Sequence, residues 1–258
     1  MGSEAVTRKL NWASHHLDLL DNAVAEYVDL KNIGFVPKRH DYANKLVWGH
    51  IESKAGGAAL EVISHMFGDV LQSAHSCLDY LVCELFLRRH PGEEAKRSHQ
   101  FPIVTSHGAF NDELGGGRLY GIPFEAVAII EGLQPYKGRT DPVPAQLLAL
   151  RTLTNTHKHR QIHVSVLTTN PAPSNVVPVE IDGEFRVRVG DLPAATHHKA
   201  ELGPFRVTDD GDVDVNREFT PVVVLEESGF RGKPIAVVAA GFCKAVGESY
   251  NLLLPFLS

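Results

Sequence analysis

The sequence predicts an α+β protein: helices first, an antiparallel β section second and an apolar helix last. Apolar residues recur at helical spacing through most of residues 7–159. Alternating β-branched runs separated by Asp-rich turns follow over residues 162–225, and residues 234–254 are apolar on most faces. We therefore expect a helical bundle over residues 1–160 and a β section with a returning helix over residues 161–258, joined into one fold.

The first helix is expected over residues 7–30, because its apolar residues recur at three- and four-residue spacing. Gly34 and Pro37 interrupt the pattern that follows. Both residue types disfavour a helix interior, glycine through its backbone entropy and proline through its missing N–H group. Residues 42–54 are therefore expected to form a short helix or an irregular link.

The strongest helical pattern runs from residue 60 to residue 89, about eight turns, and ends at Pro91-Gly92. One stripe of this helix is apolar, and a second stripe at i, i+3, i+4 and i+7 spacing is polar. Such a stripe faces solvent or lines a polar cleft, and its lack of lysine favours the cleft. Its members are His65, Asp69, Gln72, Ser76, Asp79 and Cys83, with His75 four residues before Asp79.

Residues 91–122 are expected to form a long connection that includes a glycine run at 115–117. No Lys-Ser or Lys-Thr pair follows these glycines, so a phosphate-binding loop is not supported. Two further helices are expected over residues 123–133 and 142–159. Each begins at a proline, which is favoured in the first turn of a helix.

The β section is expected to form an antiparallel sheet of about five strands, the usual size of a sheet. An Asp-Gly pair between β-branched runs is the strongest short signal for a hairpin, and Asp182-Gly183 is such a pair. The final helix is expected to pack back on the helices or on the sheet. Six segments are candidates for these strands: residues 162–167, 176–181, 184–189, 205–207, 213–215 and 220–225.

Composition excludes several classes of protein. The net charge of −6 argues against the broad positive field that non-specific binding to duplex nucleic acid needs. Cys77, Cys83 and Cys243 form an odd set with no CxxC pair, which is typical of a reducing compartment. The start of the chain does not resemble a signal peptide, and residues 235–243 are too short an apolar run to span a bilayer. A cytoplasmic protein with no membrane contact is expected.

Cationic and amide side chains gather at the end of the helix expected over residues 142–159. Arg151, Asn155 and His159 recur every four residues and so share one face, and Lys158 and Arg160 add charge at the helix end. Arginine can bind a phosphate by two parallel hydrogen bonds, histidine can exchange a proton near neutral pH, and asparagine can orient either group. These types predict either a solvated basic helix end or a site for an anionic ligand.

In the catalytic hypothesis, these side chains cleave a phosphodiester without a metal. The 2′-hydroxyl of RNA would attack, His157 or His159 would act as base or acid, and Arg151 would stabilise the charge of the transition state. Asp79 or His75, on the long helix, would orient the histidine.

The spacing of Arg151 and His157 resembles the Arg, four to six residues, His signature of the HEPN superfamily, helical proteins that include many RNA-cleaving toxins and defence nucleases. Residues 68–81 and 155–160 are also similar to recurrent segments of bacterial proteins with HEPN-like bundles. The resemblance covers about residues 60–163. It implies a helical bundle, a site at the start of a late helix that is usually completed across a homodimer, and RNA as substrate.

Two other hypotheses use the same residues. In the first, the face from residue 151 to residue 163 and the polar stripe form a cleft that binds RNA or another anionic molecule without catalysis, or brace each other through an ion pair of Asp79 with Arg151 or Arg160. Gln72, His75, Asp79, Lys158 and Arg160 are the expected binding residues. In the second hypothesis, a divalent metal is held by His157, His159 and His163 with His75 and Asp79. No HExxH motif is present, and no cofactor is expected.

Overall fold

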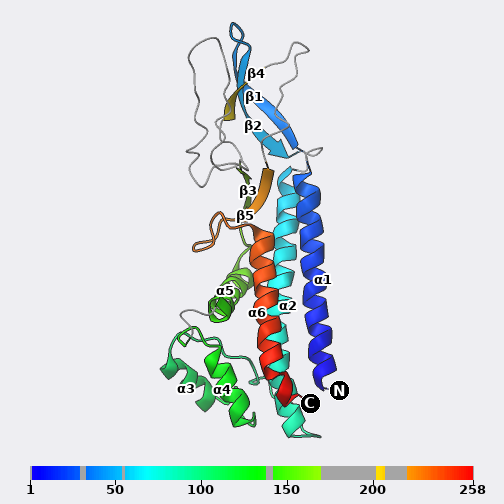
Figure 1. Cartoon of the computed structure of the whole chain (residues 1–258), viewed down its shortest axis with the longest axis vertical. Helices are drawn as coiled ribbons and strands as arrows, with labels where there is room; N and C mark the ends of the chain where they lie inside the picture. The colour runs from blue at the N-terminus through cyan, green and yellow to red at the C-terminus, as the bar shows by residue number, and fades with distance from the viewer. Residues whose placement is uncertain are drawn as a thin grey trace. The chain divides into compact units, whose positions relative to one another are not determined.

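The structure is a computed structural model (Figure 1), in which the chain forms two compact units. The helical unit consists of Met1–Asp21, Ser64–Ile162 and Ala236–Ser258, and the β-rich unit of Asn22–Ile63 and His163–Ile235. The α+β class predicted from the sequence is confirmed. The structure describes residues 2–29, 33–53, 56–137, 142–169, 202–206 and 220–257.

The unit boundaries differ from a division at residue 160. One boundary does fall close to it, between Ile162 and His163. However, residues 22–63 group with the later strands, and the C-terminal helix groups with the helices, as expected for a returning helix.

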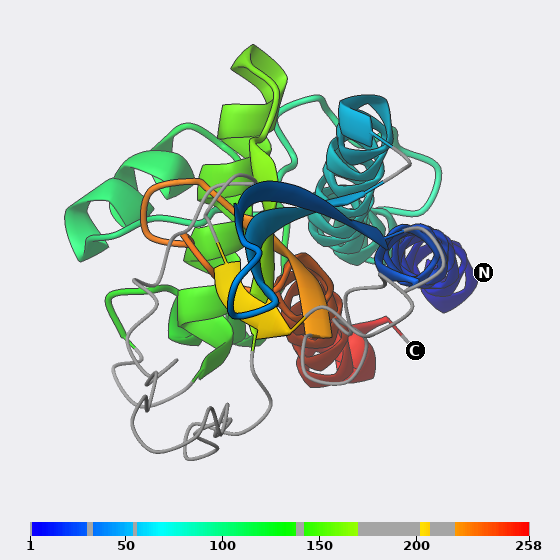
Figure 2. The same ribbon diagram turned by 90° about the horizontal axis from the view of Figure 1, so that it is seen from above.

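Helix α1, Gly2–Val28, begins five residues before the predicted start. Buried residues recur every seven positions on its core-facing side: Val6, Ala13 and Leu20. A seven-residue apolar repeat keeps one side of a helix turned toward its neighbours. Figures 1 and 2 show α1, α2 and α6 side by side with their long axes aligned.

Helix α2, Gly56–Arg89, is confirmed over the predicted residues and begins four residues earlier. It is buried around much of its circumference, with Phe67, Leu71, Leu78 and Phe86 all at most 1% exposed. The apolar stripe predicted from the sequence includes Val62 and Met66, of which Val62 is 51% exposed and Met66 is half-buried; its other members are buried: Val70, Ala74, Cys77, Leu81 and Leu85. This helix is the centre of the helical unit, so polar residues on it can contact several other elements.

The shorter helices follow α2. The predicted connection at 91–122 contains one, α3, His107–Gly115, whose first turn is capped by Ser106: its hydroxyl accepts from the N–H group of Ala109 at 3.1 Å. The two predicted helices are confirmed as α4, Phe124–Gly132, and α5, Pro142–His159. The last helix, α6, Ile235–Leu253, continues into a short 3-10 turn, η2, Leu254–Phe256.

The prediction for residues 42–54 was wrong, because they contribute to a β-hairpin. Strands β1, Ile33–Asp41, and β2, Leu46–Ser53, pair antiparallel. Pro37 is tolerated because β1 is an edge strand and its register shifts between Pro37 and Arg39, and a proline at an edge or a bulge leaves no ladder hydrogen bond unmade. The Arg39 guanidinium lies 4.0 Å from the ring centre of Trp48 on β2.

Within the described residues the strands form two sheets rather than one sheet of five strands. Strand β4, Leu202–Arg206, extends the hairpin in the order β1-β2-β4. Strands β3, Val164–Thr169, and β5, Thr220–Leu225, form a separate antiparallel pair. The strands predicted at 176–181, 184–189 and 213–215 lie outside the described residues. No helix in the described part of the chain has the length and apolar character needed to cross a membrane.

Candidate functional site

An extended, buried segment, residues 101–104, runs through the helical unit between α2 and α3. Phe101, Ile103 and Val104 are between 2% and 6% exposed. The segment belongs to neither a helix nor a strand. Its buried N–H and C=O groups therefore need hydrogen-bond partners from side chains.

Two of the predicted site residues supply such partners. The Asp79 Oδ1 atom on α2 accepts from the N–H group of Phe101 at 3.0 Å. The Arg151 Nη1 atom on α5 donates to the carbonyl oxygen of Ile103 at 2.5 Å. Asp79 and Arg151 thus act on the same segment through its backbone. The two side chains are linked through the backbone of residues 101–104, in place of the predicted direct ion pair.

A third partner, Gln134, was not predicted as a site residue; it directly follows the helix expected over residues 123–133. It is 0% exposed. Its Nε2 atom donates to the carbonyl oxygens of Pro102 and Ile130, both at 2.8 Å, and its Oε1 atom accepts from the N–H group of Val104 at 2.9 Å. A glutamine just after a predicted helix end is the only signal the sequence offers. We call Asp79, Gln134 and Arg151 the segment clamp.

Another buried side chain, His99, holds the loop before α4. The His99 Nδ1 atom accepts from the N–H group of Lys96 at 2.9 Å, so the proton of the neutral ring lies on Nε2, which donates to the carbonyl oxygen of Tyr120 at 3.2 Å. The ring packs on Phe86 at 4.2 Å between centroids. Burial lowers the pKa of His99, which favours the neutral ring, and the two hydrogen bonds select its tautomer.

The polar stripe of α2 divides into two parts. His65, Asp69 and Gln72 are exposed, so the cleft expected along the whole stripe is wrong for this part. Gln72 donates to the Ser76 hydroxyl at 3.4 Å. From His75 onward the stripe is half-buried, and the His75 Nδ1 atom lies 3.6 Å from Asp79 Oδ2. Asp79 therefore uses one oxygen for the segment and the other for His75.

His157 points into the helical unit. Its ring lies against the Cα atom of Gly68 on α2, where any Cβ atom would overlap three ring atoms. Among the described residues its buried Nδ1 atom has no hydrogen-bond partner, and neither has the hydroxyl of Thr154, one turn earlier and 1% exposed. Arg151 and His157 are six residues apart, about 240° around the helix. The two residues of the Arg-His signature thus point in different directions.

The remaining predicted residues of α5 lie on its outer side. On α5 these are Arg151, Asn155, Lys158 and His159, all exposed, and Arg160, the residue after the helix ends, is exposed as well. Arg151, Asn155, Lys158 and His159 follow i, i+4, i+7 and i+8 spacing and so form one face, which we call the donor face. The 18 residues of α5 include no Asp or Glu, so no carboxylate on this helix competes for a ligand of the donor face.

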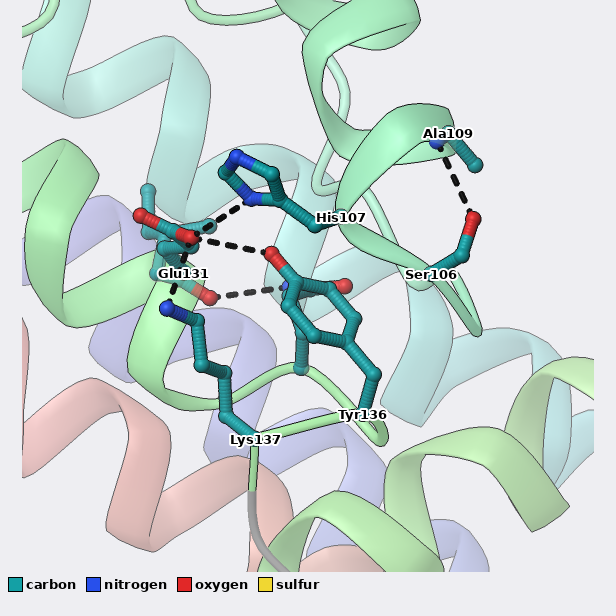
Figure 3. Close-up of polar contacts among 8 residues, drawn as sticks. Ser106, His107, Ala109, Glu131, Tyr136 and Lys137 are labelled. Carbon is teal, nitrogen blue, oxygen red and sulfur yellow. Dashed lines mark hydrogen bonds and ion pairs between the residues drawn. The ribbon is translucent and has the colours of Figure 1, made fainter.

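Another polar cluster, not predicted from the sequence, joins α3 to the end of α4 (Figure 3). One oxygen of Glu131, Oε1, lies 2.9 Å from the Lys137 Nζ atom and 3.1 Å from both the Tyr136 hydroxyl and the His107 Nδ1 atom. These contacts, the Lys137 hydrogen bond first, lower the pKa of Glu131. Partial burial, then the neighbouring carboxylate, raises the pKa of Tyr136 to about 12.

The lowered pKa of Glu131 predicts a pH-dependent contribution to stability. A carboxyl group whose pKa is depressed on folding stabilises the protein above its unfolded value, about 4.3, and loses that effect as the pH falls through the folded value. Glu131→Gln is therefore expected to lower the free energy of unfolding at pH 7, with the difference closing below about pH 4. Urea denaturation over this pH range measures it. Glu125→Gln, an exposed position on the same helix, should show no comparable difference.

The predicted metal site is not assembled. Among the described residues, no three His, Cys, Asp or Glu side chains gather closely enough to hold a metal ion. The structure thus separates the predicted residues into the segment clamp with His75, the inward-facing His157, and the donor face of α5. Comparisons of the chain with protein-family models, with curated proteins and with solved structures gave no match.

Proposed function

We propose that this chain is a HEPN-like protein that binds single-stranded RNA, without cleaving it, through the donor face of α5. The observation that carries the proposal is the exposure of Arg151, Asn155, Lys158 and His159 along a helix without a single carboxylate. An arginine and a lysine attract phosphates, and the amide and imidazole groups can donate to phosphates, riboses or base edges.

The length of the donor face favours a chain of phosphates over one small anion. From Arg151 to His159 the helix rises about 12 Å, at about 1.5 Å per residue. A single phosphate cannot contact both ends of such a row. An extended single strand can, and its unstacked bases remain available for hydrogen bonds with Asn155.

The overall charge fits a local site. With a net charge of −6, the protein as a whole repels nucleic acid, so binding has to depend on a few close contacts. Such contacts release few counterions. The affinity is therefore expected to fall only moderately with salt. A plot of the logarithm of the binding constant against the logarithm of the salt concentration should have a slope of about −0.7 for each phosphate neutralised on a single strand.

Cleavage by Arg151 and His157 is the second candidate, because the two residues keep the spacing of the HEPN signature on one helix. It has less support from the geometry. A general acid or base has to come within about 3 Å of the proton it transfers. The His157 ring lies against Gly68 with Nδ1 buried, and one Arg151 nitrogen is bound to Ile103, so cleavage would require His157 to leave its place.

The test is a titration of labelled oligouridylate with the full chain, followed by fluorescence anisotropy at several salt concentrations. Lys158→Ala is expected to weaken binding and to reduce the salt slope by about 0.7. Lys244→Ala removes a lysine from the exposed side of α6, 78% exposed, and should leave both quantities unchanged. Equal affinities of the wild type and Lys158→Ala would refute the donor face as the binding surface.

The same samples decide between binding and cleavage when the RNA is analysed on a denaturing gel. We expect intact RNA with the wild-type protein. Shortened products that disappear with both Arg151→Ala and His157→Ala would contradict our proposal of binding alone and establish the nuclease. Circular dichroism of the two variants shows whether they remain folded, since Arg151 also holds the backbone of Ile103.

A further inference from the structure

The tip of the β1-β2 hairpin gathers basic and aromatic side chains in a short stretch of the chain. We call its exposed residues of these two kinds the hairpin patch: Lys38, Arg39, His40, Tyr42 and Lys45. Between Pro37 and Trp48 the sequence contains one carboxylate, Asp41, against three lysine and arginine side chains. The patch belongs to the β-rich unit, whereas α5 belongs to the helical unit, and it lies outside the residues that resemble HEPN proteins.

The turn of this hairpin is held by the carboxylate of Asp41. Its Oδ1 atom accepts from the N–H group of Asn44 at 3.2 Å, and its Oδ2 atom accepts from the side-chain amide of Asn44 at 2.8 Å. These contacts, the side-chain one first, lower the pKa of Asp41. The next residue, Lys45, has a φ of 52°, in the left-handed region that lysine rarely adopts. Tyr42 lies within this turn, so the contacts of Asp41 also fix the backbone that carries Tyr42.

The Tyr42 ring is stacked on the ring of His40. Their centroids are 5.3 Å apart and their planes differ by 9°. Tyr42 is nevertheless 84% exposed, so the face of its ring turned away from His40 is in contact with solvent. A flat ring that is held parallel to a second ring and keeps one open face is a platform on which a nucleobase can continue the stack.

The apolar residues of the hairpin end are already used in the core. On β2, Leu46 is 7% exposed and Val47 is 0% exposed. A membrane surface would need such residues at the tip, and they are buried. An acidic peptide would satisfy the cations but leave the platform of Tyr42 unused. A single-stranded nucleic acid uses both features, because it offers a flat base and a phosphate within one nucleotide.

We propose that the hairpin patch binds one unpaired nucleobase of a single-stranded nucleic acid, which stacks on the open face of Tyr42 while Lys38 and Lys45 attract the neighbouring phosphates. The larger ring of a purine covers more of the tyrosine, so adenine is preferred to uracil. Arg39 lies over Trp48, opposite it on β2, and adds positive charge to the tip. This site depends only on residues of the hairpin and is independent of RNA binding by α5.

Fluorescence anisotropy of labelled oligoadenylate with the full chain tests the proposal, in a Lys158→Ala background so that the donor face does not mask the effect. Tyr42→Ala is expected to weaken binding about 5- to 150-fold, the loss of one base stacked on an aromatic ring. Tyr42→Phe keeps the ring and should keep the affinity. Tyr120→Ala removes another exposed tyrosine, 65% exposed in the helical unit, and should change nothing. Circular dichroism of Tyr42→Ala should match its parent, because this side chain is outside the core.

An abasic oligomer of the same length separates stacking from charge. It carries the phosphates without the bases, so Tyr42→Ala should leave its affinity unchanged. The proposal is overturned if Tyr42→Ala binds oligoadenylate as its parent does, if Tyr42→Phe is as weak as Tyr42→Ala, or if the abasic oligomer loses as much affinity as oligoadenylate. It is also overturned if Tyr42→Ala abolishes co-sedimentation with phosphatidylserine vesicles but not binding of oligoadenylate. The donor face is judged separately, by the effect of Lys158→Ala alone on oligouridylate.

Discussion

Replacing Gly68 with alanine is expected to destabilise the protein by about 1–3 kcal/mol, the range of over-packed cores. Elsewhere in a helix the same change is favourable by up to about 1 kcal/mol, because alanine has the higher helix propensity. Here the new Cβ atom would overlap three atoms of the His157 ring, so α2 and α5 have to move apart or the ring has to leave. Urea denaturation measures the difference.

Two comparisons make this prediction specific. In a His157→Ala background the obstacle is gone, so Gly68→Ala should become neutral or stabilising, a change of sign that only a direct contact produces. Gly57 lies on the same helix, and no atom of the described residues comes within 4 Å of the place that a Cβ atom would take there, so Gly57→Ala should not destabilise. If Gly68→Ala were harmless in the wild-type protein, the packing of His157 on α2 would be wrong.

The second large effect is expected at Gln134, whose replacement by alanine should cost about 3 kcal/mol. The change removes three hydrogen bonds at once, each contributing roughly 0.5–1.5 kcal/mol, and leaves the buried N–H group of Val104 without its partner. Gln134→Glu should be nearly as harmful, because a carboxylate cannot donate to the carbonyl oxygens of Pro102 and Ile130. Both variants are compared by urea denaturation with the wild type.

The matched control is Gln72→Ala, the removal of an exposed glutamine whose hydrogen bond to Ser76 is long, at 3.4 Å. It should change the free energy of unfolding by less than about 0.5 kcal/mol. Equal stabilities of Gln134→Ala and Gln72→Ala would show that the extended segment at 101–104 is not held as the structure describes it.

Elements with one dominant pattern could be predicted closely from the sequence. Helix α5 matches its predicted bounds because Pro142 marks the first turn and the basic residues mark the last, and β5 because its β-branched run has no competing helical period. The hairpin of β1 and β2 could not be predicted, since Pro37 indicates a break until the strand is known to be an edge with an irregular register.

The candidate site, too, could be predicted only in part from the sequence. Asp79 and Arg151 could be singled out as unusual polar residues on apolar helices. The backbone segment that both of them bind, residues 101–104, could not be predicted, because it shows no helical or strand periodicity. Its need for hydrogen-bond partners arises only from its burial in the folded chain. His157 matched the spacing of the HEPN signature, but spacing alone does not tell which way a side chain points. Gly68, whose missing side chain leaves room for the His157 ring, lies 89 residues away in the sequence.

In the arrangement that we propose, one nitrogen of Arg151 donates to the backbone of Ile103, while the rest of its exposed guanidinium faces RNA together with Asn155, Lys158 and His159. Photo-crosslinking with 4-thiouridine oligomers, followed by mass spectrometry of the digested protein, identifies the contacting residues without altering the chain. Crosslinks should concentrate in residues 151–161, with loss of signal at high salt. Crosslinks confined to other segments, or none at all with saturating RNA, would rule out α5 as the RNA-binding helix.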